Sequence, residues 1–240
     1  MNTMEQKSFD LSAFIADSKQ ALLKPEEYFS TMSTEGGFGP PIIKALIYGV
    51  IAGILNLIWG LLKVGAAGGA GGMFGGAVGF LALVWSIIGA LIGLFIGAVI
   101  ILILCAIANG KTDFEPILHV QAALMVVMPV SAFMNVFGVI HPVLGSLLSL
   151  AVNLYLLWML FHAMTKTLGA QVDTTKIIMY VLGGLLILFF FIGMATRRAA
   201  NTFMRDFDPD DYSGQLDKRT NTPFGESTYN DFSSDYLKKS

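Results

Sequence analysis

The chain has 240 residues, of which 55% are hydrophobic and only 13% are charged. Soluble globular domains carry about 25% charged residues, so this composition excludes a water-soluble enzyme. The formal net charge of −2 provides no basic face that could neutralise phosphates, so we expect no nucleic-acid partner.

The charged residues are concentrated at the two ends of the chain. Between residues 42 and 196 the charged side chains are Lys44, Lys63, Lys111, Asp113, Glu115, Lys166, Asp173 and Lys176. This distribution predicts an all-α integral membrane protein in three parts. They are an amphipathic cytosolic or interfacial segment (1–40), a transmembrane helical bundle (41–197), and a polar acidic and aromatic tail (198–240) that is largely disordered.

The amino-terminal segment has the pattern of a helix that lies on a membrane surface. Over residues 8–23, one helical face collects Leu11, Phe14, Ile15 and Leu22. A second helix is expected to start at Lys24-Pro25, because proline suits the first helical position. The partner-binding candidates are Phe14, Ile15, Tyr28, Phe29 and Met32. The alternative is that these residues only anchor the approach to the first span.

The charge-poor runs predict five spans, because a helix needs about 20 apolar residues to cross a bilayer. We expect these spans at 41–62, 89–108, 117–137, 142–166 and 175–196. The balance of Lys and Arg between the two sides is nearly even, so charge leaves the orientation open.

The stretch from 64 to 110 is uncharged and admits two interpretations. Residues 65–76 are rich in glycine and predict a flexible loop, after which we expect a short interfacial helix at 78–88 before the second span. A single helix over 78–108 would be roughly 46 Å long, more than a bilayer core of about 30 Å requires. The alternative divides this stretch into two spans and gives six in all.

No Asp or Glu lies inside a predicted span, which weakens an ion-coupled transporter or an intramembrane hydrolase. No metal-ligating or catalytic motif is present, so we expect no catalytic residue, no metal site and no cofactor. The polar candidates within the spans are Asn56, His119, Gln121, Asn135, Asn153 and His162. Of these, His119 and Gln121 are expected to make hydrogen bonds near the membrane interface.

Small residues repeat every four positions in three of the spans. They are Gly49 and Gly53 in the first, Gly89, Gly93 and Gly97 in the second, and Gly145 and Ser149 in the fourth. Such repeats allow helices to approach closely where lipid provides no hydrophobic drive. They predict a compact bundle, with a homo-oligomer as the alternative.

Two regions of the chain resemble a known family. Residues 23–32 read Leu-Lys-Pro-Glu-Glu-Tyr-Phe-Ser-Thr-Met, and residues 36–41 read Gly-Gly-Phe-Gly-Pro-Pro, ahead of a first span with Ala45 and Gly49. This start is similar to that of the Yip domain, the membrane domain of the Ypt/Rab-interacting protein family.

The later region resembles the same domain. Residues 108–123 match its glycine-containing turn, its aromatic residue and its return into the third span, and Met128-Pro129 matches its mid-span proline. The fourth span fits the pattern with Trp158, His162 and Gly169. The resemblance covers residues 23–193.

The resemblance implies a five-span bundle with a cytosolic amino segment and a role as an adaptor without catalytic residues. Eukaryotic relatives act in vesicle traffic with Rab-type GTPases, whereas prokaryotic relatives have no settled activity. The short segment before Lys24 favours a prokaryotic-type member in the cytoplasmic (inner) membrane. The long tail after the last span departs from the family pattern.

The functional hypothesis is therefore a non-enzymatic membrane adaptor or organiser, which binds partner proteins at its amino-terminal segment, or membrane lipids. The alternative is a channel or facilitator for a neutral small solute or lipid, with Asn56, Asn135, Asn153 and His162 as its polar path.

Overall fold

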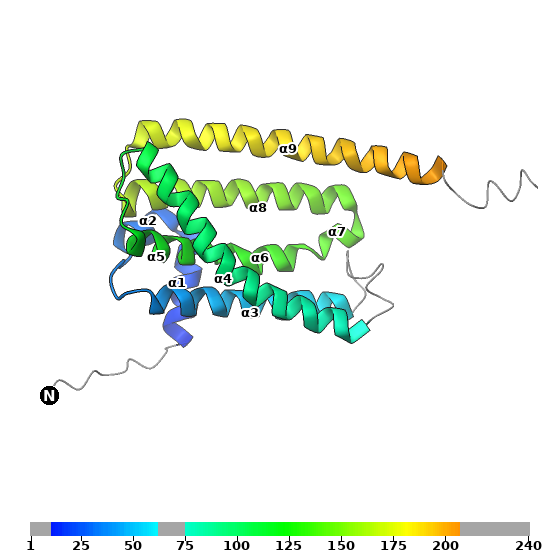
Figure 1. Ribbon diagram of the computed structural model, residues 1–240, viewed down its shortest axis with the longest axis horizontal. Helices are drawn as coiled ribbons and strands as arrows, with labels where there is room; N and C mark the ends of the chain where they lie inside the picture. The colour runs from blue at the N-terminus through cyan, green and yellow to red at the C-terminus, as the bar shows by residue number, and fades with distance from the viewer. Residues whose placement is uncertain (1–10, 62–74, 207–240) are drawn as a thin grey trace, which may run out of the picture. The chain divides into compact units, whose positions relative to one another are not determined.

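The computed structural model describes residues 11–61 and 75–206, which form helices joined by short connections (Figure 1). No strand occurs in these two ranges, so the all-α prediction is confirmed. Most of the predicted glycine-rich loop (65–74) and most of the predicted polar tail (207–240) lie outside the described residues.

Two short helices precede the spans. Helix α1 covers Leu11–Leu23 and helix α2 covers Pro25–Thr31. Pro25 begins α2, and Glu26 and Glu27 stand in its first turn, where carboxylates stabilise the positive end of a helix. The helix start predicted at Lys24-Pro25 is therefore present.

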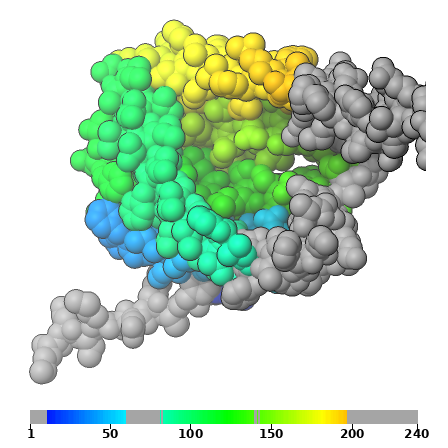
Figure 2. All heavy atoms as spheres, turned by 45° about the vertical axis from the view of Figure 1, so that its right-hand side comes forward, coloured from blue at the N-terminus to red at the C-terminus, as the bar shows by residue number. Residues whose placement is uncertain are grey.

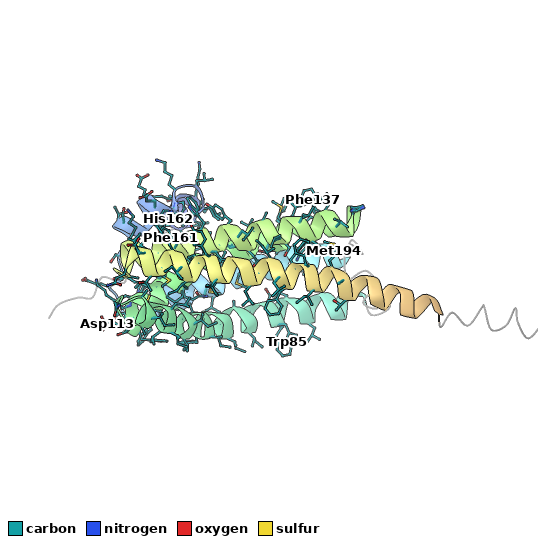
Figure 3. All side chains as sticks on the ribbon, turned by 90° about the horizontal axis from the view of Figure 1, so that it is seen from above. Trp85, Asp113, Phe137, Phe161, His162 and Met194 are labelled. Carbon is teal, nitrogen blue, oxygen red and sulfur yellow. The ribbon has the colours of Figure 1, made fainter. Side chains whose placement is uncertain are left out.

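Five helical segments are long and apolar enough to cross a membrane, as predicted. They are Gly39–Trp59 of α3 (Gly39–Leu61), Leu83–Ile107 of α4 (Gly75–Ile107), Phe114–Met134 across α5 and α6, Val143–Thr167 across α8 (Pro142–His162) and the π-helical turn η3 (Ala163–Thr167), and Val172–Thr196 of α9 (Val172–Asp206). Their outward surfaces are apolar, with Ile92, Ile96 and Trp85 exposed on α4, and Trp85 points away from the bundle in Figure 3. The chain is an integral, multi-pass membrane protein.

The prediction of a separate interfacial helix at 78–88 is wrong. Helix α4 runs without a break from Gly75 to Ile107, and its membrane-spanning part begins at Leu83. Two of its glycines, Gly89 and Gly93, do not break it, because a glycine weakens a helix by only about 1 kcal/mol and the flanking apolar residues favour one. The turns of α4 that exceed the length of a span lie before Leu83.

The third span is divided into two helices. Helix α5 covers Phe114–Leu124, helix α6 covers Val127–Met134, and the short α7 (Phe137–Ile140) follows. Pro129 has no N–H to donate to the carbonyl of Met125, which instead accepts a hydrogen bond from the Met128 N–H at 2.9 Å. The proline therefore explains the two-residue turn that separates α5 from α6.

The core of the bundle lies around α5. Ile117, Leu118 and Val120 of this helix are fully buried, and so are Ala90 and Leu94 of α4. The third span is 61% buried within the protein, far more than any other span. Helix α5 is therefore the central element on which α3, α4 and α8 pack.

Glycines bring two pairs of helices close together. A Cβ at Gly49 of α3 would lie 2.7 Å from the Ala90 Cβ of α4, and a Cβ at Gly53 would lie 3.2 Å from the Ser86 Cβ. A Cβ at Gly145 of α8 would collide with the backbone of Gly138 in α7. These three glycines stand where helix backbones meet.

The chain divides into two compact units, at residues 1–188 and 189–240. In the second unit, α9 continues to Asp206, so that residues 198–206 of the predicted polar tail are helical. Phe190 and Phe191 pack edge to face there, with ring centroids 5.7 Å apart.

Candidate functional site

Helices α1 and α2 are attached to one end of the bundle through Lys44 at the start of α3. The Lys44 Nζ donates to the Tyr28 hydroxyl at 3.1 Å and lies 3.7 Å from the Asp17 carboxylate. Burial, with the charge of Asp17, raises the pKa of the Tyr28 phenol, so that the hydroxyl stays neutral and accepts from Lys44. One lysine thus joins α1, α2 and α3.

Further contacts hold the same two helices from the other spans. The Tyr155 hydroxyl of α8 donates to the Leu22 carbonyl, and the Thr167 hydroxyl donates to the Phe29 carbonyl at 2.6 Å. Lys166 pairs with Glu26 at 2.9 Å, and this hydrogen bond and charge lower the pKa of the Glu26 carboxyl. We call α1, α2 and these contacts the amino-terminal clamp (residues 11–31).

The five partner-binding candidates are not on one free surface. Tyr28 and Phe29 are 6% and 1% exposed, and Phe14 is buried against the ring of Tyr48 with centroids 5.1 Å apart. Met32 is half-buried against the core. Ile15 alone among the five is well exposed, at 57%, because the other apolar side chains of the clamp fill the space between α1, α2 and the spans.

The connection from α2 to α3 is fixed at the same end. Gly36 and Gly37 have positive φ, and the Gly37 N–H donates to the Glu115 carboxylate at 2.6 Å. The His119 Nε2 lies 3.0 Å from the Gly37 carbonyl. His119, near the start of the third span, therefore helps to hold the α2–α3 connection.

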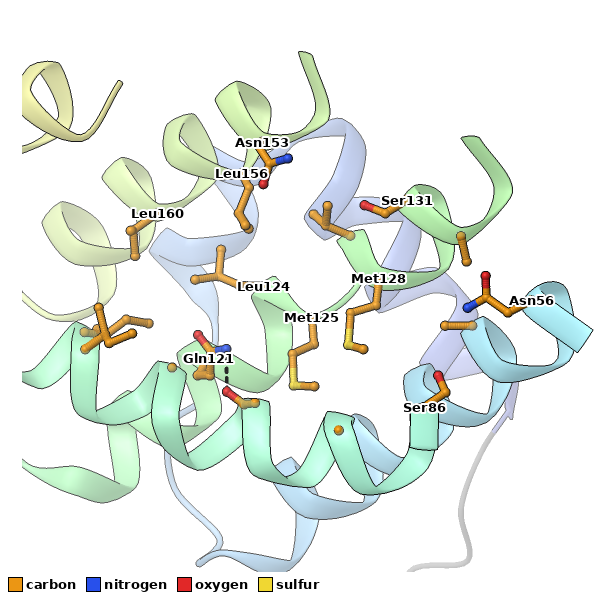
Figure 4. A pocket seen from close by; sticks show the side chains of 18 of the residues that line it. Asn56, Ser86, Gln121, Leu124, Met125, Met128, Ser131, Asn153, Leu156 and Leu160 are labelled. Carbon is orange, nitrogen blue, oxygen red and sulfur yellow. Dashed lines mark hydrogen bonds between the residues drawn. The ribbon is translucent and has the colours of Figure 1, made fainter. Parts of the chain in front are cut away.

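A second structural feature is a pocket of about 470 Å³ between α3, α4, α5, α6 and α8. Figure 4 shows its interior, and the space-filling view in Figure 2 shows a hollow between α4 and α8. Its neutral polar side chains are Asn56, Ser86, Gln121, Ser131, Asn135 and Asn153. The structure thus brings four of the six polar candidates together, namely Asn56, Gln121, Asn135 and Asn153.

The remaining two polar candidates lie elsewhere. His119 holds the α2–α3 connection, and His162 is 8% exposed against the ring of Trp158, with centroids 4.9 Å apart (Figure 3). The polar path suggested by the sequence therefore does not include His162.

Gly89, Gly93 and Gly97 of α4 line the pocket. A Cβ at Gly89 or Gly93 would meet no atom within 4 Å, so neither glycine serves a helix–helix contact. A Cβ at Gly97 would collide with the side chain of Gln121, which reaches across to donate to the Gly93 carbonyl at 3.4 Å. In the fourth span, Ser149 is exposed and its carbonyl accepts from Asn153 at 2.8 Å.

Sequence reasoning missed Ser86 and Ser131 in the pocket, and Lys44, Tyr155 and Thr167 in the clamp. Ser86 precedes Gly89 and Gly93 by three and seven positions, so the helical period could have placed it on the same stripe. The clamp contacts join residues far apart in the chain, and no local pattern signals them.

The described residues contain no group of three or more His, Cys, Asp or Glu side chains that could hold a metal ion. The pocket, as far as it is described, is lined by neutral side chains. Neutral amides and hydroxyls both donate and accept hydrogen bonds, so this lining can bind an uncharged polar group.

Comparison with curated proteins and with solved structures gives no match. A family model, the Yip1 domain, matches residues 19–195. This range includes α2, four whole spans, the fifth span except its last residue, most of the clamp and the whole lining of the pocket. The chain belongs to the Yip1 domain family.

Proposed function

We propose that this chain is a non-enzymatic membrane adaptor of the Yip type, which presents the outer face of α1 to a partner protein. The observation that carries the proposal is the clamp: contacts from Lys44, Tyr155 and Thr167 fix α1 and α2 on the bundle. Next to the buried Phe14 of α1, Leu11 and Ile15 remain 60% and 57% exposed.

A surface held in this way favours recognition. Side chains that are already ordered lose less conformational entropy on binding than those of a flexible segment. Exposed apolar residues on a fixed helix are the usual anchors of a helix-face interface. Their partner is a protein at the membrane surface or a second copy of this chain, and we place the chain in a prokaryotic cytoplasmic membrane.

The test is crosslinking and affinity purification of the full chain from gently solubilised native membranes. Ile15→Glu places a charge on the exposed face of α1 and removes none of the contacts that hold the clamp on the spans. Thr112→Glu is the matched control, because Thr112 is an exposed residue of the loop between α4 and α5. Inserted protein levels are matched between the variants.

We expect a distinct partner to be recovered with the intact chain and with Thr112→Glu, and to be lost with Ile15→Glu. Recovery of the same proteins with all three chains would contradict the adaptor proposal. Truncating Tyr28 and Phe29 is unsuitable for this test, because both fill the core of the clamp.

A second candidate function is passage of a neutral solute or lipid, and the pocket is the observation that favours it. His162 lies outside the pocket, so the polar candidates from the sequence that line this route are Asn56, Gln121, Asn135 and Asn153. Flux of an uncharged solute into proteoliposomes should fall when Asn56 and Asn153 are both changed to Leu. Unchanged flux in that variant would exclude this route.

A further inference from the structure

Polar side chains gather at one end of the pocket. Asn56, Ser131 and Asn135 lie near the ends of the first and third spans, on the side of the bundle opposite the clamp. In Figure 4, Asn56 and Ser131 stand at one side of the pocket, with Leu124 and Leu160 further along it. Three polar side chains therefore gather at one end of the pocket, and the rest of its lining is mainly apolar, apart from Ser86, Gln121 and Asn153.

The polar end has hydrogen-bonding capacity that the described part of the chain does not use. Among the described residues, no partner is found for the side-chain amides of Asn56 and Asn135 or for the Ser131 hydroxyl. Asn135 is exposed and Asn56 and Ser131 are half-buried, so a ligand in the pocket can reach these groups and pair with them.

The lining also restricts the charge of the ligand. The side chains around the pocket are neutral throughout its described lining, and no lysine or arginine is among them. A phosphate headgroup in this low-dielectric site would lack a counter-charge and pay a large desolvation cost. The ligand that fits is uncharged and carries hydroxyl or ester groups.

The floor of the pocket is a groove along α4. It extends from Gly89 past Gly93 to Gly97, a rise of roughly 12 Å at about 1.5 Å per residue. Because a Cβ at Gly89 or Gly93 would meet nothing within 4 Å, no atom of the described residues fills the space directly above them. Gln121 closes the groove at Gly97. The shape is that of a track for a narrow apolar chain.

We propose that this pocket binds one acyl chain of an uncharged, hydroxyl-bearing acylglycerol from the bilayer. The chain lies along Gly89 and Gly93 and ends at Gln121, and the glycerol hydroxyl pairs with the amides of Asn56 and Asn135. A volume of about 470 Å³ lies within the roughly 300–1,000 Å³ typical of ligand pockets. The second acyl chain of the lipid leaves the pocket through the opening between α4 and α8 and remains in the bilayer (Figure 2).

The test uses the full chain in lipid nanodiscs that contain a small fraction of diacylglycerol with a photoactivatable group on one acyl chain. After illumination, labelled peptides are mapped by mass spectrometry. We expect labels on α4 around Gly93 and on the facing residues of α5 and α8, and competition by unlabelled diacylglycerol. Phosphatidic acid with the same photoactivatable chain should label about tenfold less, which corresponds to about 1.4 kcal/mol.

Two leucine variants separate the pocket from general contact with lipid. Gly93→Leu fills the groove and should lower labelling about tenfold. Gly184→Leu is the matched control on α9, where a Cβ also meets nothing within 4 Å and the residue is outside the pocket. Equal labelling of both variants, labels spread over all the spans, or equal labelling by phosphatidic acid would overturn the proposal.

Gly93→Ala keeps the test decisive if the leucine variant fails to fold. It adds a methyl group in open space and favours the helix, so its stability is preserved while the groove narrows. Labelling that does not fall in this variant contradicts the proposal.

The lipid-binding proposal is independent of the adaptor role, since Ile15→Glu leaves the pocket intact. Lipid binding and solute passage use the same cavity but are otherwise separate proposals. Solute flux without site-specific labelling would support passage and reject lipid binding.

Discussion

The closest contact between α3 and α4 predicts a large difference between two alanine substitutions. Gly49→Ala would place a Cβ 2.7 Å from the Ala90 Cβ and 3.3 Å from the Ser86 carbonyl oxygen. Cβ atoms in folded proteins do not approach so closely, so the two helices must separate. Gly89→Ala on α4 is the matched control, because a Cβ there meets nothing within 4 Å.

The magnitude follows from two opposing effects. Both substitutions replace a helical glycine and gain about 1 kcal/mol of helix propensity. Only Gly49→Ala adds the cost of overpacking, about 1–3 kcal/mol. Since the propensity gain cancels in the comparison, Gly49→Ala should be less stable than Gly89→Ala by about 1–3 kcal/mol.

The assay is reversible unfolding of the purified protein in mixed micelles by titration with a denaturing detergent, followed by circular dichroism. Adding Ala90→Gly to Gly49→Ala removes the methyl group that the new Cβ meets, so the pair should show favourable coupling of at least about 0.5 kcal/mol. Equal stability of Gly49→Ala and Gly89→Ala, with no coupling to Ala90→Gly, would refute the packing of α3 on α4.

Two further predictions concern the clamp and the topology. Because Lys166 lowers the pKa of Glu26, the pair stabilises the folded state above the ordinary carboxyl value of 4.5, and this contribution is lost as the pH falls through the lowered pKa. Glu26→Gln should therefore lower the unfolding midpoint slightly at pH 7, and the difference should shrink as the pH falls below 4.5. A pH-independent difference would contradict this. Five spans place the two ends of the chain on opposite membrane faces. In a Cys105→Ala background, an impermeant maleimide should label only one of Lys19→Cys and Ser234→Cys in sealed vesicles, and labelling of both would indicate six spans.

The sequence predicted the spans well because their signal is local. Hydrophobic length alone determines whether a helix can cross the bilayer, and the five predicted spans overlap the five observed ones. The separate helix predicted at 78–88 was an error, because the glycines of α4 were interpreted as a boundary between two helices. Helix propensity is a weak term, and the uninterrupted apolar sequence from Leu83 to Ile107 outweighs it.

The candidate site was predictable only in part. Asn56, Gln121, Asn135 and Asn153 stood out as polar residues among apolar ones, and the structure brings them to one pocket. Their convergence depends on how the spans pack, which the sequence does not specify.

The amino-terminal candidates show the opposite outcome. An amphipathic pattern shows that one face of a helix is apolar, but not whether that face meets lipid, a partner or the rest of the same chain. Here Phe14, Tyr28 and Phe29 pack on the chain's own spans, which leaves Ile15 as the exposed member of that set.

The most direct test of the account is the accessibility of two alanines on α1. Ala21 is 1% exposed on the buried side of α1, whereas Ala16 on the same helix is exposed. Each is changed to Cys in the Cys105→Ala background, and the rate of maleimide labelling is measured in nanodiscs. The account predicts rapid labelling at position 16 and strong protection at position 21. Equal rapid labelling at both positions would show that α1 is not held against the bundle and would contradict the fixed docking surface.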